Sequence, residues 1–174
     1  MILLNKGVSV RAAEVSDAEL LTKWWNDGEV MTHAGFPYGL NTTVEKVADD
    51  IRKESDDTRR RFIIEYENIP IGEMSYKHID AKTAEISIKI CDITYQNKGI
   101  GRIVLSLFIT MLFDKGYDAI ILDTNLNNKR AQHVYETLGF KKNGVSYDCW
   151  RDQTGKLQSA VDYRLTKEDF ISFI

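Results

Sequence analysis

The segment Gln96–Arg102 has the residue types and spacing of an anion-binding helix start. Apolar residues recur with a helical period directly after it, so its backbone N–H groups would have no partner within the helix. The helix dipole adds partial positive charge at this end, and Gly99 and Gly101 allow an anion to approach closely. Lys98 and Arg102 add charged donors. A diphosphate would fit here, and a glycine-rich turn that only begins a helix explains the same letters equally well.

Two better-defined nucleotide-binding motifs are absent from this turn. The G-x-x-x-x-G-K-[ST] spacing of the triphosphate loop does not occur. Val104 stands where the dinucleotide fingerprint requires its third glycine. A diphosphate bound here would therefore belong to another class of ligand.

A second group of candidate residues lies downstream, in Asn128–Phe140. Tyr135 follows Asn128 at a spacing that places both side chains on one helix face. An asparagine amide can donate and accept hydrogen bonds, and a phenol with its ordinary pKa of about 10 keeps its proton at neutral pH. Each residue has a structural alternative, because Asn128 could be a helix N-cap and Tyr135 a core side chain.

Together the two segments resemble the cofactor-binding pattern of the GNAT acetyltransferase superfamily. Tyr95–Gly101 is similar to its Q/R-x-x-G-x-G/A motif, and Asn128–Phe140 to its N-x-x-A-x-x-x-Y-e-x-x-G-F block. Trp24–Val30 resembles the W-x-n-D-p-e-v stretch of a branch that acetylates ribosomal-protein N-termini, polyamines and some antibiotics. Gly28 replaces the usual proline of that stretch. The resemblance implies an N-acetyltransferase in which a primary amine attacks acetyl-CoA directly.

The resemblance also implies which residues bind the co-substrate. The pyrophosphate would lie on Gln96–Arg102, and main-chain groups at the end of the 84–91 strand would hold the pantetheine arm. Asn128 would contact that arm, and the small Ala131 would let it pass, although Ala131 is equally explained as helix core. The implied cofactor-binding residues are Ile90, Cys91, Gln96, Asn97, Lys98, Gly99, Ile100, Gly101, Arg102, Asn128 and Ala131.

For catalysis, the resemblance implies that Tyr135 protonates the departing thiolate. A base must also deprotonate the amine, because a free alkylamine is mostly protonated at pH 7. Glu73, Glu85 and Asp92 are candidates, and we assign Glu85 as the catalytic one. Cys91 has no histidine close in sequence, which favours a buried thiol over an acyl-enzyme nucleophile.

The acceptor pocket is expected between the early helices, their connecting loop and a C-terminal hairpin. The acceptor itself stays open among a protein N-terminus, a polyamine, an aminoglycoside-like antibiotic and a small amine. A non-catalytic acyl-CoA sensor of the same fold is the alternative function. The candidate substrate-binding residues are Trp24, His33, Phe36, Tyr38 and Trp150, of which Phe36 is equally explained as core.

Length and composition limit the remaining classes. The chain has 174 residues, which fits a single domain over 1–174, and its net charge of -3 argues against general nucleic-acid binding. Three histidines and two distant cysteines, Cys91 and Cys149, make a metal site unexpected and favour two reduced thiols over one disulfide. The residues 1–10 do not resemble a signal peptide and no segment is apolar enough to span a membrane, so we expect a cytoplasmic protein. A homodimer is compatible with these features.

The periodicity predicts an α/β (α+β) domain with a mixed, mostly antiparallel central sheet flanked by helices. Capping signals predict helices that begin after Ser16, Thr42 and Thr166. Two further helices are expected between Ile100 and Gly116 and before Gly139. By the resemblance, a splayed parallel strand pair ends near Cys91 and Leu122. The predicted strands are 8–12, 61–66, 71–78, 84–91, 119–122, 145–150 and 157–165.

Overall fold

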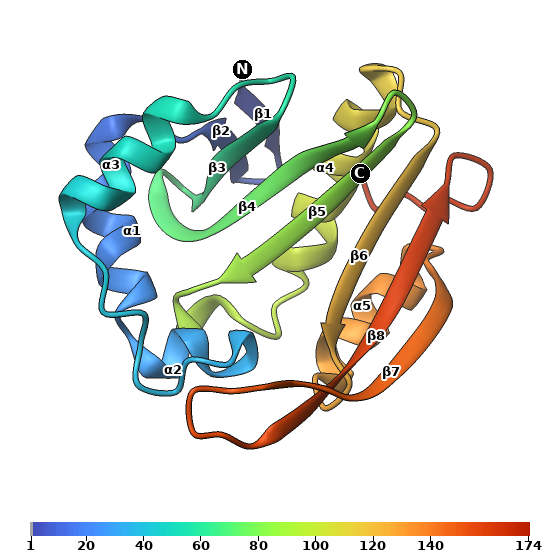
Figure 1. Ribbon diagram of the computed structural model, residues 1–174. Coiled ribbons are helices and arrows are strands. Elements are labelled where there is room, and N and C mark those ends of the chain that lie inside the picture. The colour runs from blue at the N-terminus through green and yellow to red at the C-terminus, as the bar shows by residue number, and fades with distance from the viewer. Residues whose placement is uncertain (1) are drawn as a thin grey trace.

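The computed structural model describes residues 2–174, which form one eight-stranded sheet in the order β1-β2-β3-β4-β5-β6-β8-β7 (Figure 1). β5 and β6 run parallel, whereas the other neighbours are antiparallel. The predicted mixed, mostly antiparallel sheet is therefore confirmed. The strands are β1 (Ile2–Asn5), β2 (Val8–Ala12), β3 (Arg59–Tyr66), β4 (Ile69–Asp80), β5 (Thr83–Ile90), β6 (Ala119–Asn125), β7 (Lys141–Arg151) and β8 (Leu157–Thr166).

Helices cover both faces of this sheet (Figure 1). One face carries the helices from the first third of the chain, and the other carries the two that follow β5 and β6. Among residues 2–174, no helix has the length and apolar character needed to cross a bilayer. The helices are α1 (Ala18–Trp25), α2 (Gly28–Met31), α3 (Val44–Lys53), α4 (Ile100–Asp114) and α5 (Lys129–Thr137), with 3-10 turns at Val15–Asp17, Thr32–Ala34 and Ile93–Tyr95.

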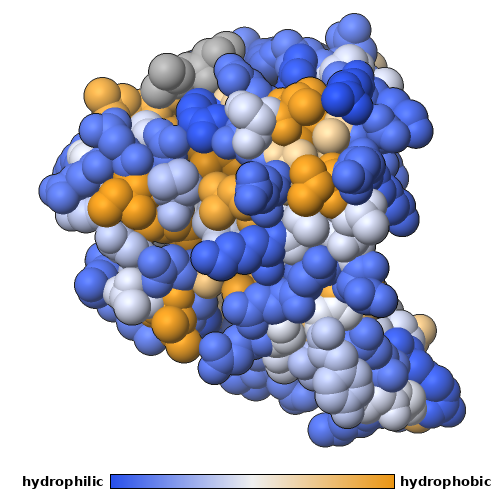
Figure 2. All heavy atoms as spheres, turned by 90° about the vertical axis from the view of Figure 1, so that its left-hand side faces the viewer, coloured by the Kyte–Doolittle hydropathy of each residue, from blue (hydrophilic) through white to orange (hydrophobic). Residues whose placement is uncertain are grey.

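Two hydrophobic clusters hold the layers together. In the larger cluster, α4 packs on the sheet, and the ring of Phe108 meets Phe62 edge-on with 5.1 Å between centroids. The smaller cluster joins α1 and α3 to the opposite face, where Leu21 and Val47 pack with Ile63. The outer surface of these two helices is mostly hydrophilic, with scattered hydrophobic side chains (Figure 2).

The largest departure from antiparallel pairing lies between β5 and β6. Their register runs from Thr83 opposite Ala119 to Glu85 opposite Ile121, and the strands are not paired beyond that point. The remainder of each strand therefore diverges from its neighbour. This divergence is the predicted splay, and it opens the sheet at the ends of both strands.

Several predicted boundaries differ from the structure for local reasons. Asp17 accepts the Glu14 N–H at 2.8 Å, so a 3-10 turn precedes α1 and Ser16 does not cap it. The α3 cap is Thr43, one residue after the predicted Thr42. No helix follows Thr166 within the described chain; an isolated turn forms instead, in which the Thr166 hydroxyl donates to Asp169. β1 was not predicted from the sequence.

Candidate functional site

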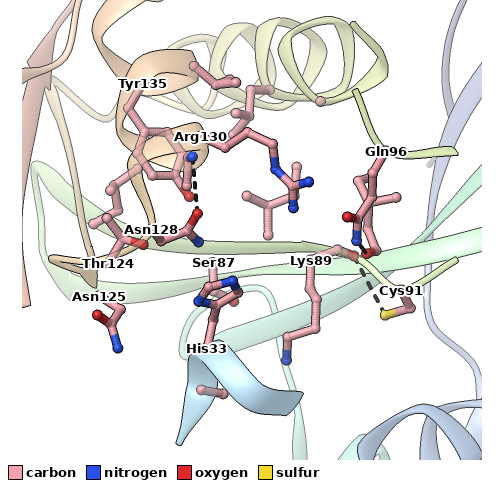
Figure 3. A pocket seen from close by; sticks show the side chains of 18 of the residues that line it. His33, Ser87, Lys89, Cys91, Gln96, Thr124, Asn125, Asn128, Arg130 and Tyr135 are labelled. Carbon is pink, nitrogen blue, oxygen red and sulfur yellow. Dashed lines mark hydrogen bonds between the residues drawn. The ribbon is translucent and has the colours of Figure 1, made fainter. Parts of the chain in front are cut away.

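A cavity of about 1530 Å³ passes through the opening between β5 and β6 and has walls on both faces of the sheet. The start of α4 and the α5 helix line one half, which we call the donor half. The segment 27–34, side chains of β5 and the β7–β8 hairpin line the other, which we call the acceptor half. Figure 3 shows the two halves on opposite sides of β5, with Tyr135 and Arg130 on one side and His33 and Lys89 on the other.

The splay leaves backbone groups of β5 directed at the cavity. The Cys91 N–H donates to Ile71 of the preceding strand at 2.8 Å. Since antiparallel pairing alternates, the N–H and C=O of Ile88 and the N–H of Ile90 are directed toward the gap. The Ile90 carbonyl accepts from Gln96 Nε2 at 2.9 Å. Polar backbone is thus available in this gap between β5 and β6, which we call the slot, although the N–H of Cys91, a predicted cofactor-binding residue, is already bonded.

The Gln96–Arg102 turn has the conformation of an anion-binding loop. Asn97 and Gly99 have positive φ angles of 59° and 75° and line the cavity at the start of α4, where the first backbone N–H groups have no partner within the helix. A Cβ atom added to Gly101 would meet nothing within 4 Å, so open space lies above this position. Of the predicted loop residues, Lys98 does not line the cavity, and its ammonium lies 5.5 Å from the Tyr95 ring centroid.

Asn128 and Ala131 both line the donor half. The Asn128 carboxamide oxygen accepts the Ala131 N–H at 3.2 Å, so Asn128 is the N-cap of α5. This hydrogen bond orients the side chain beside the slot (Figure 3). The two alternatives weighed for Asn128 are therefore compatible, since one oxygen caps the helix while the amide stays in the cavity wall.

Tyr135 lines the cavity and is 7% exposed. Its ring packs against Phe140 and Tyr163, each with 5.8 Å between centroids. Burial, with a further contribution from the Asp123 carboxylate, raises the pKa of Tyr135 to about 12. The hydroxyl therefore stays protonated at physiological pH and can act as a proton donor.

Basic side chains of α5 were missed by the sequence reasoning. Lys129, Arg130 and His133 line the donor half, and Arg130 extends across the slot toward Gln96 (Figure 3). Arg102 lines the same half from α4. The sequence signal for these residues was the basic pair Lys129 and Arg130 directly after Asn128. The lysine and the two arginines suit a polyanionic ligand.

The carboxylates considered as bases have other roles or positions. Glu73 is 6% exposed and accepts from Trp25 Nε1 at 2.6 Å and from Arg61 at 2.7 Å. Glu85 does not line the cavity, because it lies where β5 and β6 are still paired. Asp92 lines the cavity but caps a 3-10 turn through Thr94. None of the three is a free carboxylate in the acceptor half.

The predicted acceptor residues separate into three groups. His33 and Trp150 line the acceptor half. Trp24 is buried in the α1–α3 cluster and Phe36 packs against that cluster, so both contribute to the core. The Tyr38 side chain is 75% exposed outside the cavity. Helical spacing alone did not distinguish core aromatics from those facing the ligand.

The acceptor wall is held by contacts between distant segments. A Cβ at Gly35 would lie 2.3 Å from the Trp150 ring, so only glycine allows this approach at its φ of 95°. The Gln153 side chain accepts from the Tyr38 N–H at 2.8 Å and donates to the Gly39 carbonyl at 3.0 Å. The β7–β8 hairpin tip thus fixes the loop that carries His33, and no local sequence signal marks this contact.

The remaining polar groups of the acceptor half come from β5, β6 and α2. Ser87 and Lys89 line it from β5, and Lys89 Nζ lies 3.9 Å from the Glu73 carboxylate. Asp27, Glu29 and Asp123 add acidic groups. The alternation of side chains along β5 was visible in the sequence, but it does not show which face of the sheet receives the ligand.

The cysteines are separate free thiols, and Cys91 lines the cavity. Burial raises the pKa of the Cys91 thiol well above its usual range, with the Glu73 charge adding to the effect. A thiol that resists ionisation is a poor nucleophile. This favours the structural interpretation of Cys91.

Several known proteins are similar to this chain in sequence or in structure. Human (Homo sapiens) N-acetyltransferase 8 is 33% identical over 58 residues, which are 33% of this chain and 26% of that protein. The chain is also similar in structure to spermidine N-acetyltransferase from Vibrio cholerae in complex with CoA and spermine (TM-score 0.84, 23% identity, 95% and 98% of the two chains covered). It is similar to RimL, a ribosomal L7/L12 alpha-N-protein acetyltransferase, in complex with CoA (TM-score 0.83, 18% identity, 95% and 98% covered).

These structural likenesses establish the shared fold, and the alignment to the human protein spans about a quarter of its length. The family comparison covers far more of the sequence. The pattern described as "Acetyltransferase (GNAT) domain" matches residues 8–141, from β2 through α5 to the start of β7. The chain therefore belongs to the GNAT acetyltransferase family.

Proposed function

We propose that this chain transfers an acetyl group from acetyl-CoA to a primary amine by direct attack of the amine on the thioester. The observation that carries the proposal is the single cavity through the β5–β6 splay. This cavity joins an anion-binding helix start to a buried, protonated Tyr135 and continues into an acceptor half on the opposite face.

The donor half fits a thioester of CoA. The free N–H groups at the start of α4, together with Arg102 and Arg130, suit a diphosphate, and open space above Gly101 leaves room for it. The backbone groups of Ile88 and Ile90 suit the amides of an extended arm. The position of Asn128 at the slot supports a further amide contact.

The residues at the slot supply what this reaction needs. The thioester provides an acyl group with a good leaving group. A backbone N–H of Ile88 or Ile90 can donate to the acetyl carbonyl oxygen and stabilise the negative charge that develops there. Tyr135 holds its proton at neutral pH and can give it to the departing sulfur.

The acceptor classes to test follow from the related proteins. One structural neighbour is a spermidine N-acetyltransferase, and another is an alpha-N-acetyltransferase of ribosomal protein L7/L12. Both acceptors present a primary amine. The same class of acceptor suits this chain, because its acceptor half opens directly onto the slot.

A thiol-release assay with acetyl-CoA tests the proposal. The amines are spermidine, a peptide with a free N-terminal serine, an aminoglycoside and a simple alkylamine, and mass spectrometry identifies the acetylated product. Calorimetry with CoA is run in parallel. Release of thiol that depends on one of these amines supports the enzyme, whereas tight CoA binding without turnover of any amine would establish the sensor alternative.

A further inference from the structure

His33 occupies a distinctive place in the acceptor half. It projects from the Thr32–Ala34 turn toward β5, on the opposite side of the strand from Tyr135 (Figure 3), and lines the same cavity as Ser87. Within residues 2–174 its imidazole makes no hydrogen bond or ion pair, and it lines the cavity. The ring nitrogens are therefore free to meet an acceptor that enters from this face.

The carboxylates of the same cavity are less suited to removing a proton. Asp27 is bonded to the Glu29 N–H at 2.9 Å as the cap of α2, and Asp92 is bonded to Thr94. Carboxylates ordinarily titrate near pH 4, so they are weaker bases at neutral pH than an imidazole. Burial and the facing Asp162 raise the pKa of Asp123, which makes Asp123 the competing base that an experiment must exclude.

We propose that His33 is the general base that deprotonates the acceptor amine, which rests on the proposed acetyl transfer. A ring nitrogen of His33 takes one proton from the acceptor ammonium and later releases it to solvent. The lone pair of the acceptor amine nitrogen then forms the C–N bond to the acetyl carbon, and the C–S bond of the thioester breaks. Tyr135 protonates the sulfur, and the second proton lost by the amine nitrogen restores the phenol. The acetamide and the free thiol of CoA result.

The position of His33 depends on the contacts of its loop with Trp150 and with Gln153 of the β7–β8 hairpin. Gly35 follows it closely and packs under Trp150, while the Gln153 N–H donates to the Gly35 carbonyl at 2.8 Å. The turn that carries His33 is thus fixed on the hairpin tip. A base must lie within hydrogen-bond reach of the proton it removes, and this anchoring restricts where the ring can lie.

The charged groups that share this half with His33 come from three elements. Asp27 and Glu29 lie on its own segment, Lys89 projects from β5, and Asp123 projects from β6. The pH dependence of the reaction must therefore be measured for variants of more than one group. Histidine ordinarily changes its charge between about pH 5 and 8, and the raised pKa of Asp123 brings that carboxylate closer to the same range.

The test compares His33→Ala, Asp123→Asn and the wild type in thiol release with spermidine or the serine peptide, whichever reacts faster. We expect His33→Ala to lower kcat/KM at pH 7 by about 100-fold or more, because general base catalysis contributes on that order. Added imidazole should restore part of the rate of His33→Ala but none of that of Asp123→Asn. The acid limb of the wild-type pH profile should be lost in His33→Ala.

Three results would reject His33 as the base. The first is a kcat/KM of His33→Ala within threefold of the wild type. The second is a loss of rate in His33→Ala that added imidazole does not restore. The third is an acid limb of the pH profile that disappears in Asp123→Asn and persists in His33→Ala. His78→Asn is the matched control, since His78 lies outside the cavity, with its Nδ1 atom 3.1 Å from the Tyr117 hydroxyl oxygen. If the wild type itself turned over no amine, the proposed function would fail before this question arose.

A binding measurement on the wild type does not depend on turnover. The chain has three histidines, so their ring proton signals in an NMR spectrum can be assigned with single variants. We expect CoA alone to move the His133 signal, and spermidine or the peptide added with CoA to move the His33 signal, while His78 moves with neither. A His33 signal that does not respond to the reactive amine would contradict contact with the acceptor.

Discussion

The two halves of the cavity are built in different ways. The donor half comes from short segments whose function depends on backbone conformation, with Gln96–Arg102 at one helix start and Asn128 capping the next. The acceptor half is assembled from side chains of segments far apart in sequence, and the Tyr38–Gln153 hydrogen bond spans 115 residues. A local motif can therefore identify the donor in a family whose acceptors differ.

The largest expected effect concerns Tyr135, which lies where the halves meet. Tyr135→Phe keeps the ring and its contacts with Phe140 and Tyr163 but removes the proton donor. We expect kcat to fall by about 10² to 10⁴, the usual contribution of a general acid, while the Kd for CoA changes less than threefold. Steady-state thiol release and calorimetry measure the two quantities.

The raised pKa of Tyr135 fixes the sign of its pH effect. Because burial moves the pKa upward to about 12, the phenol loses its proton only as the pH rises through that range. Its ionisation should therefore cause no fall in kcat between pH 7 and 10. Tyr147→Phe, at an exposed tyrosine of β7, is the matched control. An unchanged kcat in Tyr135→Phe would exclude the acid role.

The next effect should be confined to the donor half. Gly101→Phe adds a large side chain in the open space above the α4 start, where a Cβ would meet no atom within 4 Å apart from its own neighbouring helix backbone. The fold should tolerate the change, but the ring would occupy the proposed pyrophosphate position. We expect the Kd for CoA to rise about 10- to 100-fold, since charge-assisted hydrogen bonds contribute about 1.5–3 kcal/mol each.

Two measurements separate this effect from misfolding. The melting temperature of Gly101→Phe should stay close to that of the wild type, and Gly101→Ala should weaken CoA binding less than Gly101→Phe. Equal CoA affinity in the wild type and Gly101→Phe would mean that the anion lies elsewhere. Such a result would remove the distinction between a backbone-built donor half and a side-chain-built acceptor half.

The fold could be predicted mostly because its signals are local. Strand alternation in 84–91 and the helical period after Ile100 come from residues that lie next to one another in sequence. Boundaries failed where side-chain hydrogen bonds decide them. Arg11 reaches from β2 to Asp17 at 2.9 Å, where Asp17 also accepts the Glu14 N–H, and this moved the predicted cap of α1.

The site divides in the same way. The turn at Gln96, the cap at Asn128 and the buried Tyr135 were all identified from the sequence as candidates, and all line the cavity. The choice of Glu85 placed the base on the paired part of β5, because sequence cannot show where two parallel strands separate. Trp24 and Phe36 had the right residue type, but both pack into the cluster that α1 and α3 form with Ile63, and this packing is not visible in the sequence.

Gln153 offers the most selective change in the acceptor half. Its two side-chain hydrogen bonds hold the backbone of Tyr38 and Gly39, and its own N–H holds Gly35. The side chain lies outside the cavity lining. Removing it should therefore act only through the position of the loop that carries His33.

We expect Gln153→Ala to raise KM for the reactive amine roughly fivefold, because losing such hydrogen bonds costs about 1 kcal/mol in the placement of the loop. The Kd for CoA should not change, since the donor half makes no use of the hairpin tip. Steady-state kinetics at saturating acetyl-CoA and calorimetry with CoA measure the two effects. Lys156→Ala, at an exposed side chain of the same tip, is the control. If CoA affinity fell together with amine affinity, the halves would be coupled through the hairpin instead of being separately built.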